Sequence, residues 1–253
     1  MSLLAPWRRA RPVDPEIWAE VVADSPLLGA FDIGARERLR ELAGRFLGAK
    51  SIEGAGGLEL DQRIRTTIAG LACVPILELG LDWYAGWRSV IVYPADFVAT
   101  HTYVDEAGVV HEEVRELSGE AWPRGPMVLS WEGVEESARG EVWGNVVLHE
   151  CAHKLDLLDG DANGMPPLHA GMDERAWTDA FTAAYHDFAA LVDAGEDIPF
   201  DEYAADDPGE FFAVVCESFF CDPDIVESWY PEVYDRLREF FRQDPLTRLS
   251  ASP

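Results

Sequence analysis

The sequence has little positive charge. Its 253 residues include 20 Lys and Arg against 47 Asp and Glu, which gives a formal net charge of −27. Nucleic acids and anionic lipid headgroups are bound mainly by cationic side chains that neutralise phosphates. The charge therefore argues against a direct nucleic-acid partner and against a membrane surface. Lysine occurs only at Lys50 and Lys154, and we interpret this scarcity as compositional bias.

Cysteine and long apolar segments are also scarce. The four cysteines form no CxxC pair, whereas small disulfide-stabilised secreted domains are dense in cysteine. No run approaches the ~18 apolar residues that a membrane span needs. The short apolar stretch at the N-terminus precedes its arginines, which is the reverse of the order in a signal peptide. We therefore expect a cytoplasmic protein.

A large apolar fraction predicts a packed core in spite of the charge. Hydrophobic residues make up 48% of the chain, with 9 Trp and 12 Phe among them, so the chain is not of the disordered class. Periodicity indicates helices early and late in the chain and strands between them. The expected helices cover residues 15–22, 33–46, 60–77, 142–158, 174–194, 208–220 and 231–242. The expected strands cover residues 90–93 and 127–131, with β-like runs over 99–120 around a turn at 105–108, and a charged loop that ends at Gly140.

One motif indicates metal chemistry. The segment from His149 to His153 reads HECAH, the HExxH pattern. Residues four apart lie one turn apart on one face of a helix, so both imidazoles can reach a single Zn²⁺ at ~2.0–2.1 Å. Glu150 would then lie beside the metal, where it can accept a proton from water. Cys151 falls on the opposite, apolar side of the helix, and we interpret it as a packing residue.

A catalytic zinc needs a third protein ligand. Asp159 stands where the metzincin pattern HExxHxxGxxH places its third ligand, but Asp156 replaces the glycine that turns the chain back. Asp156 is then either a group that orients a ligand imidazole or a solvated polar residue. We keep Asp159 as the runner-up for the third ligand.

The better candidate for the third ligand lies on the apolar helix expected over residues 208–220. A carboxylate on a buried helix must be paired, hydrogen-bonded or bound to a metal. Glu210 and Glu217 are seven positions apart and share one face of this helix. However, Asp207 and Glu210 also have the spacing of a capping box. From the residues alone, Glu210 is equally well interpreted as a metal ligand or as part of the helix cap. Glu217 is a weaker candidate for the metal ligand.

Four segments spread over most of the chain carry a family resemblance. They read HECAHKLDLLDGDANGMPPL, YAADDPGEFFAVVCESFF, LDWYAGWRSVIVYPADF and QDPLTRL. In these segments the chain resembles the Mlc titration factor A family of bacterial zinc-dependent peptidases. The resemblance implies a gluzincin-type core, similar to the protease domain of anthrax lethal factor.

The resemblance also assigns roles to residues. It implies zinc ligation by His149, His153 and Glu210, with Glu150 as the base. Tyr203, seven positions before Glu210, would be the phenol that steadies the oxyanion. Glu217 is then left to contact the ligands rather than the metal.

The fold that follows is a single α+β, zincin-like metallopeptidase domain. Strands in the middle with helices after them favour one such domain, with a small mixed sheet, an HExxH active-site helix and a mostly helical C-terminal half. We expect an N-terminal tail at residues 1–13, the domain at 14–245 and a C-terminal tail at 246–253. Within the domain, a helical part would cover 14–77 and the catalytic core 78–245.

The function implied is a zinc-dependent peptidase with aminopeptidase-like activity on peptide or protein substrates. Substrates of zincins commonly pair with a sheet edge, and strand 127–131 is our candidate for that edge. The alternative is a regulatory binding protein that sequesters a transcriptional repressor of sugar uptake. A net charge of −27 would attract the basic surface of such a DNA-binding regulator.

Overall fold

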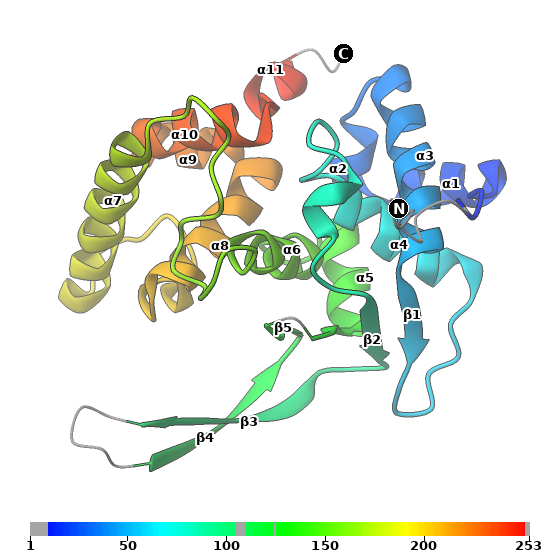
Figure 1. Ribbon diagram of the computed structural model, residues 1–253, viewed down its shortest axis with the longest axis horizontal. Coiled ribbons are helices and arrows are strands. Elements are labelled where there is room, and N and C mark those ends of the chain that lie inside the picture. The colour runs from blue at the N-terminus through cyan, green and yellow to red at the C-terminus, as the bar shows by residue number, and fades with distance from the viewer. Residues whose placement is uncertain (1–9, 105–109, 124, 251–253) are drawn as a thin grey trace, which may run out of the picture.

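Helices pack against a small sheet in the computed structural model, which describes residues 10–104, 110–123 and 125–250. The fold is the α+β arrangement that the sequence predicts, and Figure 1 shows the helices on one side of the strands. The turn predicted at residues 105–108 lies outside the described residues. No helix in the described part of the chain combines the length and apolar character of a membrane span.

The N-terminal part is helical, as predicted. Its helices begin at Asp or Ser residues whose side chains accept backbone N–H groups, the usual N-cap arrangement. The helix predicted over 60–77 is shorter than expected, because Pro75 follows closely and cannot continue it. The elements are α1 (Pro15–Asp24), α2 (Pro26–Gly29), α3 (Ile33–Ala49), β1 (Ser51–Gly54), α4 (Gln62–Cys73) and the 3-10 helix η2 (Leu81–Tyr84).

The chain packs on α3 upstream of the predicted domain start at residue 14. The amide of Arg11 donates to the carbonyl of Gly44 at 2.8 Å, and Val13 is buried. At the other end, a short helix, α11 (Pro245–Ser250), occupies part of the segment predicted as a tail.

The main sheet has four strands in the order β1-β2-β6-β5. β1, β2 and β6 are parallel, and β5 runs antiparallel to β6. The strands other than β1 are β2 (Ser89–Tyr93), β5 (Gly119–Ala121) and β6 (Met127–Ser130). The prediction that the strand at 127–131 forms the sheet edge is therefore wrong. β6 lies between β2 and β5, and the edge strands are β1 and β5.

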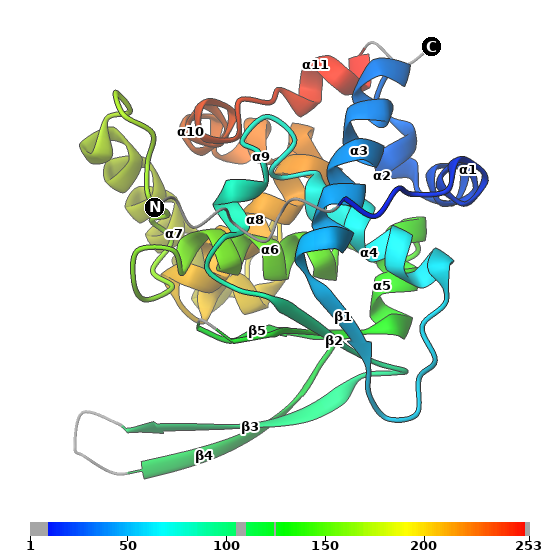
Figure 2. The ribbon, with the colours of Figure 1, turned by 45° about the vertical axis from the view of Figure 1, so that its right-hand side comes forward.

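A second pair of strands leaves the body of the molecule. β3 (Phe97–Val104) and β4 (Val110–Leu117) form an antiparallel hairpin that runs away from the helices, as Figures 1 and 2 show. The β-like runs predicted over 99–120 are thus β3, β4 and β5.

The charged segment after β6 is a helix rather than the predicted loop. α5 (Trp131–Arg139) begins at the Ser130 cap and ends at Gly140, which has a φ of 68°. The charged residues lie on the outer face, while Val134 and Ala138 are buried on the inner one. The charged residues of this segment recur at helical spacing, but a segment rich in charge also resembles a polar loop. The prediction considered the charge and not the spacing, and so it missed this helix.

The C-terminal half is helical, as predicted. Its first helix starts later than expected, because Gly144 has a φ of 81° and Asn145 provides the N-cap. The elements are α6 (Val146–Asp156), α7 (Glu174–Ala194), η3 (Glu202–Ala205), α8 (Pro208–Cys221), α9 (Pro223–Trp229) and α10 (Pro231–Phe241).

The core places α6 and α8 at the centre of the molecule. α8 is buried from Phe211 through Phe220, and it packs against α6 and the C-terminal helices. On its outer side Trp177 of α7 stacks on Phe181, with ring centroids 4.5 Å apart. These two central helices carry the motifs that the sequence identifies.

Candidate metal centre

α6 and α8 bring three ligand atoms together. The Nε2 atoms of His149 and His153 lie 3.1 Å apart. Oε2 of Glu210 lies 3.1 Å from Nε2 of His149 and 3.2 Å from that of His153. Ligand atoms bound to a tetrahedral zinc ion at ~2.0–2.1 Å are roughly 3.3 Å from one another. The donor set and its spacing therefore fit a zinc ion.

The structure distinguishes between the candidates for the third ligand by their positions. Asp159 is exposed in the loop after α6 and lies outside this cluster. Asp207 caps α8, because its Oδ1 accepts from the amides of Gly209 at 2.7 Å and Glu210 at 3.0 Å. The Glu210 side chain turns instead toward the histidines, as the contacts above show. Asp207 is thus the N-cap of α8, and the carboxylate of Glu210 lies among the possible metal ligands instead.

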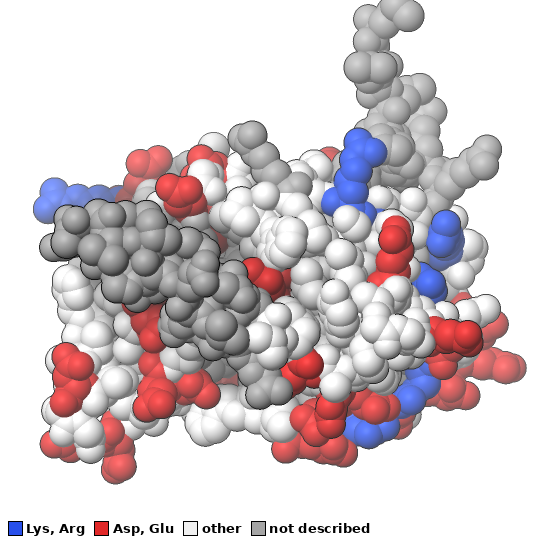
Figure 3. Space-filling model, turned by 90° about the horizontal axis from the view of Figure 1, so that it is seen from below, with Lys and Arg blue, Asp and Glu red and all other residues white. Residues whose placement is uncertain are grey.

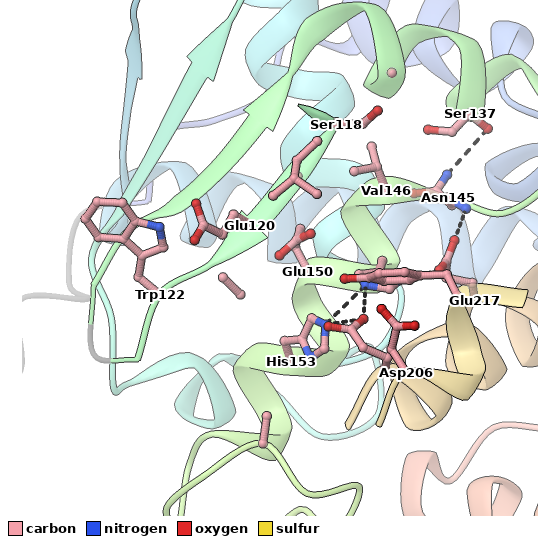
Figure 4. A pocket seen from close by; sticks show the side chains of 18 of the residues that line it. Ser118, Glu120, Trp122, Ser137, Asn145, Val146, Glu150, His153, Asp206 and Glu217 are labelled. Carbon is pink, nitrogen blue, oxygen red and sulfur yellow. Dashed lines mark hydrogen bonds and ion pairs between the residues drawn. The ribbon is translucent and has the colours of Figure 1, made fainter. Parts of the chain in front are cut away.

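Glu217 contacts the ring nitrogen of His149 that does not face the cluster. Its Oε1 lies 2.6 Å from Nδ1 of His149, and its Oε2 accepts the amide of Asn145 at 2.5 Å. A carboxylate on the far ring nitrogen fixes the tautomer and the direction of a metal-binding imidazole. Figure 4 shows Glu217 reaching the start of α6 in this way.

Charge compensation in the cluster favours a cation. Burial acts to lower the pKa of His149, but the charge of Glu217 and the hydrogen bonds to Glu210 and Glu217 hold it well above its usual value. Burial acts to raise the pKa of Glu210, and the hydrogen bonds from the two histidines outweigh it and lower that pKa. The carboxylates of Glu210 and Glu217 thus stabilise positive charge at this point.

Glu150 lies next to this cluster in a buried position. It is 3% exposed, and its Oε2 has no hydrogen-bond partner among the described residues. Burial raises its pKa to about 7, near the optimum for a group that takes up and releases protons. β5 covers it so closely that a Cβ added at Gly119 would lie 2.8 Å from Cγ of Glu150.

The structure decides the open assignments on α6. Asp156 is fully buried, so the interpretation as a solvated residue is wrong. Its Oδ2 accepts the amide of Gly164 at 2.7 Å, and burial raises its pKa to about 6. This hydrogen bond fixes the loop after α6 rather than a ligand imidazole. Cys151 is buried in the core, as predicted.

Tyr203 faces the cluster from η3. Its ring centroid lies 6.3 Å from that of His149, and the side chain lines the same cleft as the three donors. η3 precedes α8 directly, which explains why a tyrosine seven positions before Glu210 lies near it.

A cleft of about 1140 Å³ opens over the cluster between β5, α6 and η3. Figure 4 shows Glu120 and Trp122 on one side of Glu150, with Asp206 and Glu217 on the other. No Lys or Arg lines the cleft within the described ranges. Besides Glu150, Glu210 and Glu217, its acidic lining consists of Glu120, Glu136, Asp161, Asp206 and Asp207.

The sequence carries no periodic signal for the residues that β5 contributes to the cleft. This strand has only three residues, too few to show a periodicity. It nevertheless supplies Gly119 and Glu120 to the lining, and the turn after it supplies Trp122.

Comparison with known proteins gives a consistent answer. Residues 4–242 match the family described as glucose-regulated metallo-peptidase M90. Curated relatives bear the name Mlc titration factor A. The Salmonella arizonae protein is 39% identical over 238 residues, which cover 92% of this chain and 93% of the relative. The Cronobacter sakazakii protein is 36% identical over 248 residues, covering 96% and 93%. The protein of Enterobacter sp. strain 638 is 38% identical over 237 residues, covering 92% and 88%.

Replacing Glu217 by Gln tests its action on His149. We expect zinc affinity to fall by about 10–100-fold, because a neutral amide holds the imidazole less firmly. Competition with a chromogenic chelator measures the affinity. Glu227→Gln, at an exposed position of α9, is the matched control and should bind zinc like the wild type. Equal affinities for all three proteins would contradict the orienting role.

Proposed function

The chain belongs to the glucose-regulated metallo-peptidase M90 family, and on that basis we propose that it is a zinc-dependent peptidase with aminopeptidase-like activity. The observation that carries the proposal is the meeting of His149, His153 and Glu210 beside the buried Glu150. The family resemblance drawn from the sequence is confirmed. The choice of zinc and the roles of the individual residues are part of the proposal.

The proposed hydrolysis of a peptide bond needs only a few side chains of this site. His149, His153 and Glu210 would hold the ion. When bound, zinc supplies a Lewis acid that lowers the pKa of water toward ~7 and polarises a carbonyl. Glu150 accepts the proton of the attacking water at its unpartnered Oε2. Tyr203 donates its phenol O–H to the oxyanion that develops at the peptide carbonyl.

β5 is the edge on which an extended substrate would lie. One side of β5 pairs with β6, and its other side has no strand partner among the described residues. All three of its residues line the cleft beside Glu150. A peptide that pairs with such an edge gains backbone hydrogen bonds whatever its side chains are. This edge replaces β6, the strand that the sequence indicated.

Exposed tryptophans at the cleft support binding of apolar substrate side chains. Trp122 is 49% exposed and Trp143 is 63% exposed, and both line the cleft. Large apolar side chains exposed at the rim of a cleft are typical of binding sites. They would contact side chains on either side of the scissile bond.

The acidic lining supports a preference for a substrate amine. The carboxylates of Glu120, Asp206 and their neighbours create a negative potential in the cleft. Acidic side chains also spread over the face shown in Figure 3. A free N-terminal ammonium or a basic side chain is therefore favoured near the reacting bond.

A second proposed function is capture of a transcriptional repressor. The relatives' name, Mlc titration factor A, refers to titration of Mlc, and a net charge of −27 suits the basic surface of a DNA-binding protein. Either function would operate in the cytoplasm, in keeping with four cysteines that form no disulfide.

Glu150→Gln tests the peptidase function. We expect the variant to retain zinc and to lose about 10²–10⁴-fold in kcat/KM on a panel of peptides, because the general base is gone. Glu174→Gln, at an exposed position of α7, is the control. Equal cleavage by variant and wild type would refute the assignment. Retained zinc without turnover by the wild type, together with a tight complex with a repressor, would favour the binding function.

Blocking the substrate amine tests the aminopeptidase-like preference. A hydrogen bond to a charged group contributes ~1.5–3 kcal/mol, so a peptide with a free N-terminus should be cleaved about tenfold or more faster than its acetylated form. Mass spectrometry of the products of the two peptides measures both the rate and the bond that breaks. Equal rates with internal cleavage would show an endopeptidase.

A further inference from the structure

Both lysines of the chain are buried. Lys50 is 4% exposed and Lys154 is 3% exposed, so each places its ammonium inside the protein. A lysine is almost never buried unless its ammonium is compensated. Each of them donates to backbone carbonyl groups and lies near the ring of Trp87, with Nζ 3.8 Å and 5.5 Å from its centroid, respectively.

Lys154 binds the turn that follows the edge strand. Its Nζ donates to the carbonyls of Trp122 at 2.8 Å, Gly125 at 3.1 Å and Pro126 at 3.1 Å. An ammonium has three N–H donors and no acceptor, so these three carbonyls use its full capacity. The turn closes around it, because the amide of Trp122 donates to the carbonyl of Pro126 at 3.1 Å and that of Gly125 to the carbonyl of Trp122 at 3.0 Å.

The same helix face also contacts the other end of β5. Glu150 and Lys154 are four residues apart on α6, and therefore lie one turn apart on one face. Gly119 packs on Glu150 at the start of β5, and the Trp122 carbonyl binds Lys154 just after its end. The strand is therefore fixed to the active-site helix at two points.

We propose that Lys154 is a positioning residue that fixes the edge strand β5 along α6, so that a substrate strand paired with β5 is in register with the metal centre. This inference rests on the proposed peptidase function. Without the ammonium, the carbonyls of Trp122, Gly125 and Pro126 lose its three hydrogen bonds and the turn after β5 shifts. β5 is an edge strand of three residues, so it has little of its own pairing to hold it in place.

The test compares Lys154→Met with Lys50→Met. Lys50 is the matched control, because its ammonium donates to the carbonyls of Tyr84 and Trp87, which lie outside β5 and its turn. Lys154→Arg is a second variant, which keeps the charge but presents a planar donor group that cannot match three carbonyls around one nitrogen. Zinc content and circular dichroism verify that each protein is folded.

Two readouts are needed. Hydrogen exchange of the amides at residues 119–122 reports the attachment of β5 without any turnover, and we expect it to accelerate about tenfold or more in Lys154→Met, the effect of losing roughly one net hydrogen bond. In steady-state kinetics KM should rise about tenfold with kcat little changed, again the effect of one lost hydrogen bond. Lys154→Arg should lie between wild type and Met, and Lys50→Met should match the wild type in both readouts.

Three results would overturn the inference. They are unchanged exchange of β5 in Lys154→Met, equal effects of Lys154→Met and Lys50→Met, and a fall in kcat at constant KM. The last would show that Lys154 acts through its charge on Glu150. If the wild type cleaves no peptide, the proposed function fails, and the exchange measurement alone decides whether Lys154 positions β5.

Discussion

The buried contact between α6 and α8 is the constraint on which the site depends. α8 is apolar nearly all round, yet it presents two carboxylates to α6, and a buried carboxylate without compensation costs several kcal/mol. Glu217 is compensated by the amide of Asn145 and by Nδ1 of His149. Glu210 faces the Nε2 atoms of two imidazoles. A divalent cation among these three atoms would satisfy all of them at once.

The rest of the fold holds α6 in the position that this contact requires. Asp156 binds the amide of Gly164, whose carbonyl accepts the indole N–H of Trp177 at 3.0 Å, so the loop after α6 is fixed to α7. On the opposite side β5 lies over Glu150, with Lys154 beneath its turn. Groups outside the metal centre thus hold α6 at its start, along its length and at its end.

Much of the site could be predicted from the sequence, because it depends on local spacing. HExxH requires only the pitch of one helix, and the capping signal at Asp207 fixes the start of α8. The choice between ligand and cap for Glu210 needed the family resemblance, because spacing alone allows both. The edge strand could not be predicted, since β5 has three residues and pairs with a neighbour that looked like an edge itself. The role of Lys154 depends on a tertiary contact, which leaves no periodic signal.

Zinc content after substitution of the third ligand tests the central claim most directly. The wild type and the Asp159→Asn variant should each hold about one zinc ion per chain, as a closed set of three protein ligands requires. Glu210→Gln should be isolated with far less zinc under the same conditions, with its secondary structure intact. Zinc retained by Glu210→Gln but lost from Asp159→Asn would contradict the account of this site.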